Sequence, residues 1–97
     1  MDHGGWVYIM TNKPNGVLYI GGTADLARRV WQHRQGEGAK FARRYGCTRL
    51  VYAEPHDRIE EAIAREKAMK AWPRLWKLRL IQQQNPEWSD LFDRMIT

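Results

Sequence analysis

The sequence has few of the residues that stabilise small folds by cross-linking. Its 97 residues include one cysteine, Cys47, which cannot form an internal disulfide, so the fold does not depend on an oxidising compartment. The three histidines, His3, His33 and His56, are too scattered for a Cys/His metal cluster. Hydrophobic residues make up 43% of the chain, which predicts a globular fold held by an apolar core.

Long apolar runs are also missing. No run approaches the roughly 20 residues that a membrane helix needs, and the first residues lack the basic-then-apolar pattern of a secretion signal. We therefore expect a soluble cytoplasmic protein with no membrane partner. The chain is long enough for one domain with a modest core and contains no linker, repeat or low-complexity tract. Residues 1–97 are accordingly expected to form a single domain.

The chain has a net charge of +5, and acidic residues are scarce in two of its segments. Residues 25–49 carry seven Lys or Arg against two acidic residues, and residues 65–79 carry six against one. Clustered positive charge favours a polyanionic partner such as nucleic acid. The same charge is equally consistent with a basic face that contacts only solvent.

The order of the predicted elements indicates an α+β fold with a small, mostly antiparallel sheet covered by helices. Asn15-Gly16 favours a tight hairpin between the first two strands, because this pair suits the turn that antiparallel strands need. Residues 38–48 are expected to form a basic loop or a short irregular segment. The predicted strands are 6–11, 17–21 and 49–54, and the predicted helices are 24–36, 57–72, the next one to about 84, and a short one within 87–95.

Local signals mark where the predicted helices begin. Thr23 or Asp25 is expected to cap the first helix, since both side chains can accept a hydrogen bond from a backbone N–H of its first turn. Asp57-Arg-Ile-Glu60 has the form of a capping box for the second helix. Pro73 either stops that helix or occupies the first turn of the next one.

Glu66 interrupts the apolar stripe of the predicted helix 57–72. At 100° per residue it falls between Ala62 and Ile63, close to Ile59. A carboxylate in that position is costly unless it is paired or binds a metal. Glu66 is therefore either partly buried and paired with a nearby Arg, or an active-site carboxylate.

Arg29 and His33 form a second polar pair beside an apolar stripe. They are four residues apart on the predicted helix 24–36 and flank its buried side, whereas Arg28 points to solvent. Tyr8 and Tyr19 occupy strand positions that alternate with apolar residues, so the two tyrosines should lie close together across the hairpin. Taken singly, each of these features has a structural explanation.

Taken together, the residues form an ordered set that resembles the GIY-YIG endonucleases. Tyr8 in Trp6-Val-Tyr8 and Tyr19 in Tyr19-Ile-Gly21 are similar to the two halves of the GIY-YIG motif. The stretch from Gly22 through Arg29 to His33 resembles the helix of that family, and Glu66 resembles its metal-binding glutamate. The first half of the motif lacks its initial glycine. The chain resembles the small single-domain bacterial branch of the family over nearly its whole length.

The resemblance implies a three-stranded antiparallel sheet flanked by helices, and hydrolysis of phosphodiesters with one divalent metal. Glu66 would hold Mg²⁺ or Mn²⁺, hard cations that prefer oxygen ligands, and Arg29 would contact a phosphate oxygen. Either Tyr8 or His33 would be the general base that deprotonates the attacking water. Tyr19 could orient the water or the phosphate. Asn85 is similar to a further family residue, but its distance in sequence from Glu66 leaves that assignment open.

The expected partner is nucleic acid, with DNA favoured over RNA and with weak sequence specificity. Two other functions remain open: a non-cleaving nucleic-acid-binding module with the same fold, and a structural or protein-interaction domain. The sequence does not determine the oligomeric state. Five basic side chains are expected to contact phosphates without reading sequence: Arg28, Arg34, Lys40, Arg43 and Arg44.

Overall fold

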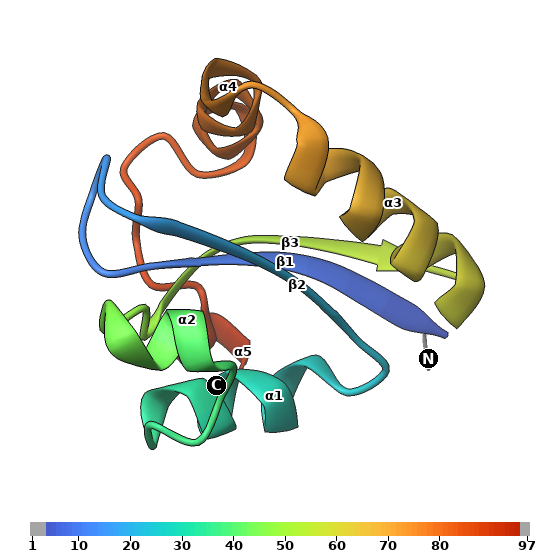
Figure 1. The fold of residues 1–97 in the computed structure, drawn as a ribbon, viewed down its shortest axis with the longest axis horizontal. Coiled ribbons are helices and arrows are strands. Elements are labelled where there is room, and N and C mark those ends of the chain that lie inside the picture. The colour runs from blue at the N-terminus through green and yellow to red at the C-terminus, as the bar shows by residue number, and fades with distance from the viewer. Residues whose placement is uncertain (1–3, 96–97) are drawn as a thin grey trace.

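A small sheet lies at the centre of the fold, between two layers of helices (Figure 1). The computed structural model describes residues 4–95. Its strands are β1 (Gly5–Thr11), β2 (Leu18–Thr23) and β3 (Arg49–His56), which pair in the order β2-β1-β3, antiparallel throughout. The helices are α1 (Leu26–Arg34), α2 (Lys40–Arg44), α3 (Ile59–Ala71), α4 (Arg74–Gln84) and α5 (Phe92–Met95). The predicted α+β class with a three-stranded antiparallel sheet is confirmed.

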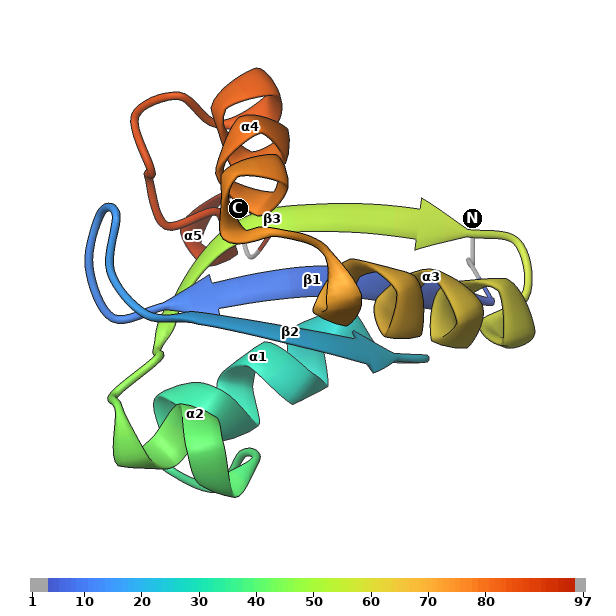
Figure 2. The same ribbon diagram turned by 45° about the horizontal axis from the view of Figure 1, so that its top comes forward.

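Both faces of the sheet are covered. Helices α3 and α4 lie on one face, and α1, α2 and α5 lie on the other (Figure 1). Helix α3 runs along the strands, whereas α4 stands at a steep angle to them (Figure 2). Among residues 4–95, no helix is long and apolar enough to cross a membrane.

The central strand β1 supplies side chains to two separate cores. Successive side chains of a strand point to opposite faces of the sheet. Val7 and Ile9 pack in the core under α3 and α4, whereas Tyr8 and Met10 pack in the core under α1, α2 and α5. This confirms the predicted separation of Val7 and Ile9 from Tyr8. All four side chains are fully buried, because β1 has a strand on each side and helices on both faces.

The segment 38–48, expected to be a loop or an irregular segment, contains the five-residue helix α2. No proline interrupts Lys40–Arg44, and its alanine, Ala42, packs against the sheet with 1% of its surface exposed. The other apolar residue of α2, Phe41, is 48% exposed, so Ala42 is the residue that places this helix in the core. The element is too short for its apolar periodicity to be visible in the sequence.

The start of α3 differs from the predicted capping box. The N-cap residue is Arg58 rather than Asp57, and the carboxylate that reaches back belongs to Glu61, whose Oε1 accepts from the Arg58 backbone N–H at 3.3 Å. Because β3 continues to His56, the helix begins two residues later than expected. Pro73 is the N-cap residue of α4, so it separates the two helices.

Candidate active site

The two tyrosines of the predicted site lie together on the α1 face of the sheet. Tyr8 of β1 pairs with Gly21, and Tyr19 of β2 pairs with Met10, so the tyrosines are diagonal neighbours. Their ring centroids are 6.3 Å apart. A side chain on Gly21 would collide with the Tyr8 hydroxyl and ring. Glycine at this position therefore lets the phenol lie flat against the neighbouring strand.

Helix α1 brings His33 against both tyrosines. The Tyr8 Oη and His33 Nε2 atoms are 2.9 Å apart, which makes a buried hydrogen bond. The imidazole ring is 5.6 Å from the Tyr8 ring and 5.2 Å from the Tyr19 ring, between centroids. Burial, and secondly the positive charge of Arg29, lower the pKa of His33 to about 4. The imidazole is therefore neutral at physiological pH.

Arg29 lies one helical turn before His33 and interacts with the hydroxyls of Tyr8 and Tyr19. Its hydrogen bond with Tyr8 is the main cause that raises the pKa of Arg29. A second partner is Gln32, whose Oε1 accepts from Arg29 Nη1 at 3.1 Å. Arg29 is partly buried and Arg28 is exposed, which confirms the orientation predicted from the helical period.

The electrostatic balance at Tyr8 shows which groups act on it. Burial raises the pKa of the Tyr8 phenol well above its usual value, the hydrogen bond from Arg29 opposes that shift, and the charges of Tyr19 and Glu66 add to it. Glu66 thus acts on Tyr8, although it comes from the helix layer on the other face of the sheet. The phenol has no exposed surface in this state of the protein.

Glu66 reaches the edge strand β2 from α3. A Cβ on Gly22 would lie 2.6 Å from Glu66 Oε1, so the carboxylate occupies the space that a side chain on β2 would fill. Its Oε2 pairs with Lys70 Nζ at 2.7 Å, and 21% of the Glu66 side chain is exposed. The predicted stripe is correct for Ala62, which is fully buried, but wrong for Ile63, which is 42% exposed.

The carboxylate of Glu66 is a single oxygen ligand of the kind that a hard divalent cation prefers. Among residues 4–95, no group of three or more His, Cys, Asp or Glu side chains could hold a metal. Mg²⁺ does not need such a group, because it is commonly bound by one or two carboxylates together with water and substrate phosphates. The carboxylate of Glu66 is partly exposed beside Gly22 and can provide that single protein ligand.

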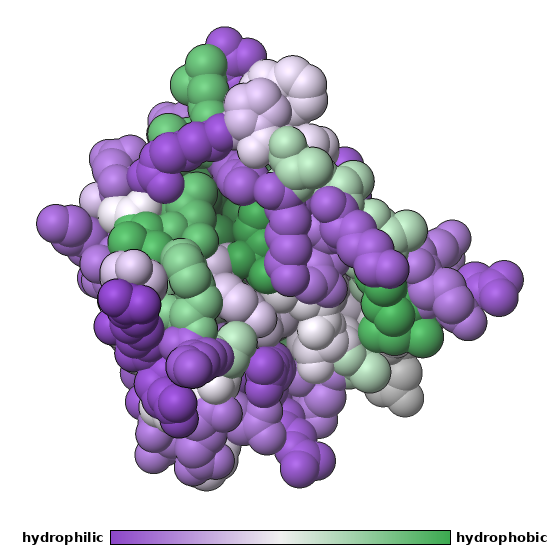
Figure 3. Space-filling view, viewed as in Figure 1, coloured by the Kyte–Doolittle hydropathy of each residue, from purple (hydrophilic) through white to green (hydrophobic). Residues whose placement is uncertain are grey.

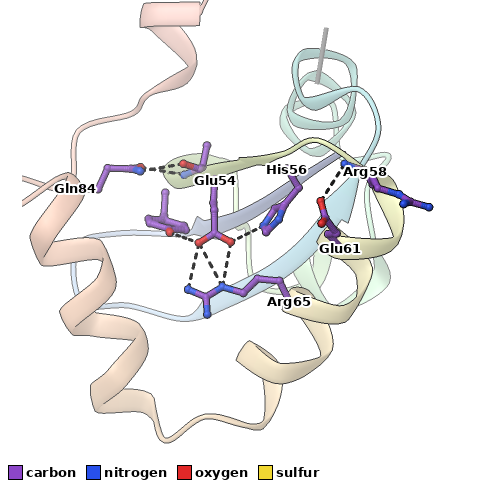
Figure 4. A network of polar contacts seen from close by, with 8 residues as sticks. Glu54, His56, Arg58, Glu61, Arg65 and Gln84 are labelled. Atoms are coloured by element: carbon purple, nitrogen blue, oxygen red, sulfur yellow. Dashed lines mark hydrogen bonds and ion pairs between the residues drawn. The ribbon is translucent and has the colours of Figure 1, made fainter. Parts of the chain in front are cut away.

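A polar network joins α3 to β3 (Figure 4). The Arg65 guanidinium donates to both carboxylate oxygens of Glu54 on β3, at 3.0–3.4 Å. Glu54 also accepts from Tyr52 at 2.6 Å and contacts His56 at 2.6 Å. Burial alone would raise the pKa of Glu54, but these hydrogen bonds lower it. Because Arg65 is held against β3, the next residue, Glu66, is directed towards β2.

Comparison with known proteins gives the family of the chain. The family model described as the GIY-YIG catalytic domain matches residues 4–79. The chain belongs to the GIY-YIG family. It is 37% identical over 78 residues to a UPF0213 protein of Staphylococcus saprophyticus, and 38% identical over 78 residues to a UPF0213 protein of Staphylococcus aureus. Each of these matches covers 80% of this chain and 94% of the relative. No solved structure matches the chain.

Membership of the GIY-YIG family indicates a nuclease domain that acts on nucleic acid, and such nucleases typically use a divalent metal. The missing glycine of the first half-motif leaves the strand intact. Trp6 stands within the half-motif and pairs regularly with Thr23 on one side and Pro55 on the other.

Helices α1 and α2 present a basic surface. The five basic residues that we predicted to contact phosphates differ in their surroundings. Arg28, Lys40 and Arg43 are exposed, and Arg44 lies over the Tyr45 ring with its guanidinium carbon 5.5 Å from the centroid. Arg34 instead pairs with Asp90 at 2.6 Å and lies over the ring of Phe92. Arg34 therefore has a carboxylate partner within the chain.

Asn85 lies outside the cluster. Its Nδ2 donates to Val51 O at 3.1 Å and Ser89 O at 2.8 Å, and its Oδ1 accepts from Ser89 N at 3.1 Å. Val51 belongs to β3, on the far side of β1 from β2. The hydrogen bonds of Asn85 join the turn after α4 to β3.

Three residues beside the cluster were not predicted from the sequence. Lys70 pairs with Glu66, Phe41 stacks on Tyr19 with a centroid distance of 6.4 Å, and Gly22 makes room for Glu66. The spacing of four between Glu66 and Lys70 was a visible signal for their pairing. Phe41 gave no such signal, because its contact depends on how α2 packs against the sheet.

Proposed function

We propose that this protein is a metal-dependent endonuclease that hydrolyses phosphodiester bonds, with DNA as the favoured substrate. The observation that carries the proposal is the buried hydrogen bond between Tyr8 and His33. Tyr19 and Arg29 lie beside this pair. The charge of the Glu66 carboxylate raises the pKa of the same Tyr8 phenol. Proton-transfer groups and a cation for phosphate thus lie on the α1 face of the sheet, and an oxygen ligand for a metal reaches the edge strand β2 from the α3 face.

Each side chain has a role that follows from its surroundings. Glu66 would hold Mg²⁺ or Mn²⁺, and the bound ion supplies positive charge for the phosphate and the leaving oxygen. Arg29 binds a non-bridging phosphate oxygen, since its guanidinium is partly exposed and permanently charged. Tyr19, beside Tyr8 and partly exposed, orients the attacking water.

The Tyr8–His33 hydrogen bond supports a two-part general base. Tyr8 takes a proton from the water while its own phenolic proton passes to His33 Nε2, 2.9 Å away. Burial and, secondly, the charge of Arg29 lower the pKa of His33 to about 4. A phosphate that pairs with Arg29 cancels this contribution, so substrate binding raises the basicity of His33.

The decisive test compares wild type with Glu66→Gln and with Glu60→Gln. Both changes remove one carboxylate from α3, but Glu60 is 70% exposed and lies outside the cluster. Labelled DNA and RNA of duplex, branched and single-stranded form are incubated with Mg²⁺, with Mn²⁺ or with chelator. We expect wild type and Glu60→Gln to cut DNA only with metal, and Glu66→Gln to bind without cutting. A folded Glu66→Gln protein that cuts at the wild-type rate would refute the mechanism.

A non-cleaving binding module is the second candidate. It is favoured by the 2.7 Å pair between Lys70 and Glu66, since an ammonium group occupies one of the two carboxylate oxygens. This candidate predicts nucleic-acid binding with a steep salt dependence and no cleavage under any metal condition. The metal series above therefore separates the two functions.

A further inference from the structure

A cavity of about 280 Å³ opens beside the candidate active site, along the edge strand β2. Its floor is formed by Leu18, Tyr19 and Ile20, one wall by Phe41 of α2, and the opposite side by Lys70 and Lys77. In the space-filling view, hydrophobic side chains gather between α4 and α2 and are bordered by hydrophilic ones (Figure 3). The cavity thus combines an aromatic surface with two ammonium groups.

The aromatic wall is an exposed, supported platform. Phe41 is 48% exposed, lies nearly parallel to Tyr19 with 28° between the ring planes, and contacts the Tyr45 ring at a centroid distance of 4.9 Å. Neighbouring rings hold Phe41 in place while half of its surface stays open. An exposed aromatic ring in this setting suits stacking with any nucleobase, because every base has a flat π-face.

The lysines on the opposite side give the cavity its charge. Lys70 pairs with Glu66, so it lies at the boundary between the cavity and the candidate active site. Lys77 Nζ donates to the Lys70 backbone oxygen at 3.4 Å, which places a second ammonium at the end of α3. Two lysines facing an aromatic ring match a nucleotide, whose base is flat and whose phosphate is anionic.

We infer that this cavity binds an unpaired nucleotide next to the scissile phosphate, with its base on Phe41 and its phosphate at Lys70 and Lys77. This inference rests on the proposed function and specifies its substrate class: single-stranded nucleic acid, or a junction with an unpaired strand. Tyr19 belongs both to the cavity and to the candidate active site, so a nucleotide held here is adjacent to the reacting phosphate. In a continuous duplex the base would first have to leave its stack, which disfavours binding of paired strands.

The test measures binding in chelator, where cleavage cannot interfere. End-labelled single-stranded DNA, the RNA of the same sequence and a continuous DNA duplex are titrated with wild type, Phe41→Leu and Phe41→Tyr. We expect Phe41→Leu to weaken single-strand binding about tenfold and duplex binding less than about twofold, because only the unpaired base stacks on the ring. Phe41→Tyr should retain binding, since it keeps the ring. The DNA and RNA arms identify which strand the cavity prefers.

Matched controls separate this cavity from a general surface effect. Trp76 is 51% exposed but does not line the cavity, so Trp76→Leu should leave single-strand binding unchanged. The slope of the logarithm of the single-strand binding constant against the logarithm of salt concentration should fall by about one in Lys77→Gln. Lys67, on the exposed side of α3, should contribute less, so Lys67→Gln should reduce this slope less. Equal losses on duplex and single strand, or tight single-strand binding by Phe41→Leu, would overturn the inference.

Cleavage by wild type is scored separately on the same substrates. Selective loss of single-strand binding in Phe41→Leu, together with no cleavage by wild type, would support the cavity and reject the nuclease function. Cleavage by wild type combined with unchanged binding by Phe41→Leu would reject the cavity and leave the nuclease function intact.

Discussion

His33 should make the stability of this protein depend on pH in a way that one substitution can remove. The imidazole is 3% exposed, and burial and Arg29 lower its pKa to about 4, whereas an unfolded chain has an ordinary value of about 6.5. The unfolded state therefore binds a proton more readily than the folded state. Stability from the neutral imidazole is fully present above pH 6.5 and is lost as pH falls towards 4.

The size of the effect follows from the two pKa values. A shift of one pKa unit corresponds to about 1.4 kcal/mol, so the drop of His33 from its ordinary value to about 4 lowers the free energy of unfolding by about 3 kcal/mol between pH 7 and pH 4. We expect His33→Gln to lack this loss, because glutamine does not titrate. The variant should be less stable than wild type at pH 7, and the difference should shrink or reverse at pH 4.

Urea denaturation of both proteins at pH 7, 5.5 and 4 measures this difference, and groups common to both cancel in the comparison. An NMR titration of the His33 ring in wild type provides a direct check on the midpoint. Parallel pH profiles for wild type and His33→Gln would show that His33 is not a buried neutral histidine, and the two-part general base would lose its support.

Four further predictions concern cleavage, its specificity and the packing of the sheet. Arg29→Ala should abolish cleavage at saturating substrate, whereas Arg28→Ala should only weaken binding; equal losses of turnover would show that the wrong arginine was chosen. Gly22→Ala should lower the melting temperature little but reduce cleavage strongly, because its Cβ would lie 2.6 Å from Glu66 Oε1 and the flexible carboxylate must move. Gly21→Ala should instead destabilise the fold by about 1–3 kcal/mol through overpacking against the Tyr8 ring, and thermal melts of the two variants distinguish these outcomes. Cleavage mapping on random duplex and branched substrates should show weak sequence preference, since exposed Lys and Arg position a backbone without reading bases; a single cut sequence shared by all substrates would contradict it.

Pattern in the sequence predicted the strands and long helices within about two residues at each end. The reason is that each long element repeats its own period: alternation in β1 assigns Val7 and Ile9 to one core and Tyr8 to the other. The five-residue α2 has no repeat to read, and its contacts with the rest of the fold are made by the buried Ala42 and by Phe41, which lies on Tyr19. Short elements are therefore decided by tertiary packing.

A helical wheel fixes angles within a helix but not the rotation of that helix against the sheet. This is why Ile63, placed in the buried stripe from the sequence, is exposed, whereas Glu66 lies against Gly22. The rotation of α3 is set by Arg65 and Glu54, which are 11 residues apart in sequence and belong to different elements. Long-range pairs of this kind cannot be read from local spacing.

The sequence by itself determined the fold class, the identity of the five candidate site residues and the family, because these depend on residue types in a fixed order. Only the tertiary structure decided what those residues contact: the hydrogen bond between Tyr8 and His33, and the Lys70 partner of Glu66. It also decided that Phe41 stacks on Tyr19 and that Asn85 lies elsewhere. The physical reason is that pKa, pairing and exposure depend on neighbours in space, which strand register and helix packing bring together.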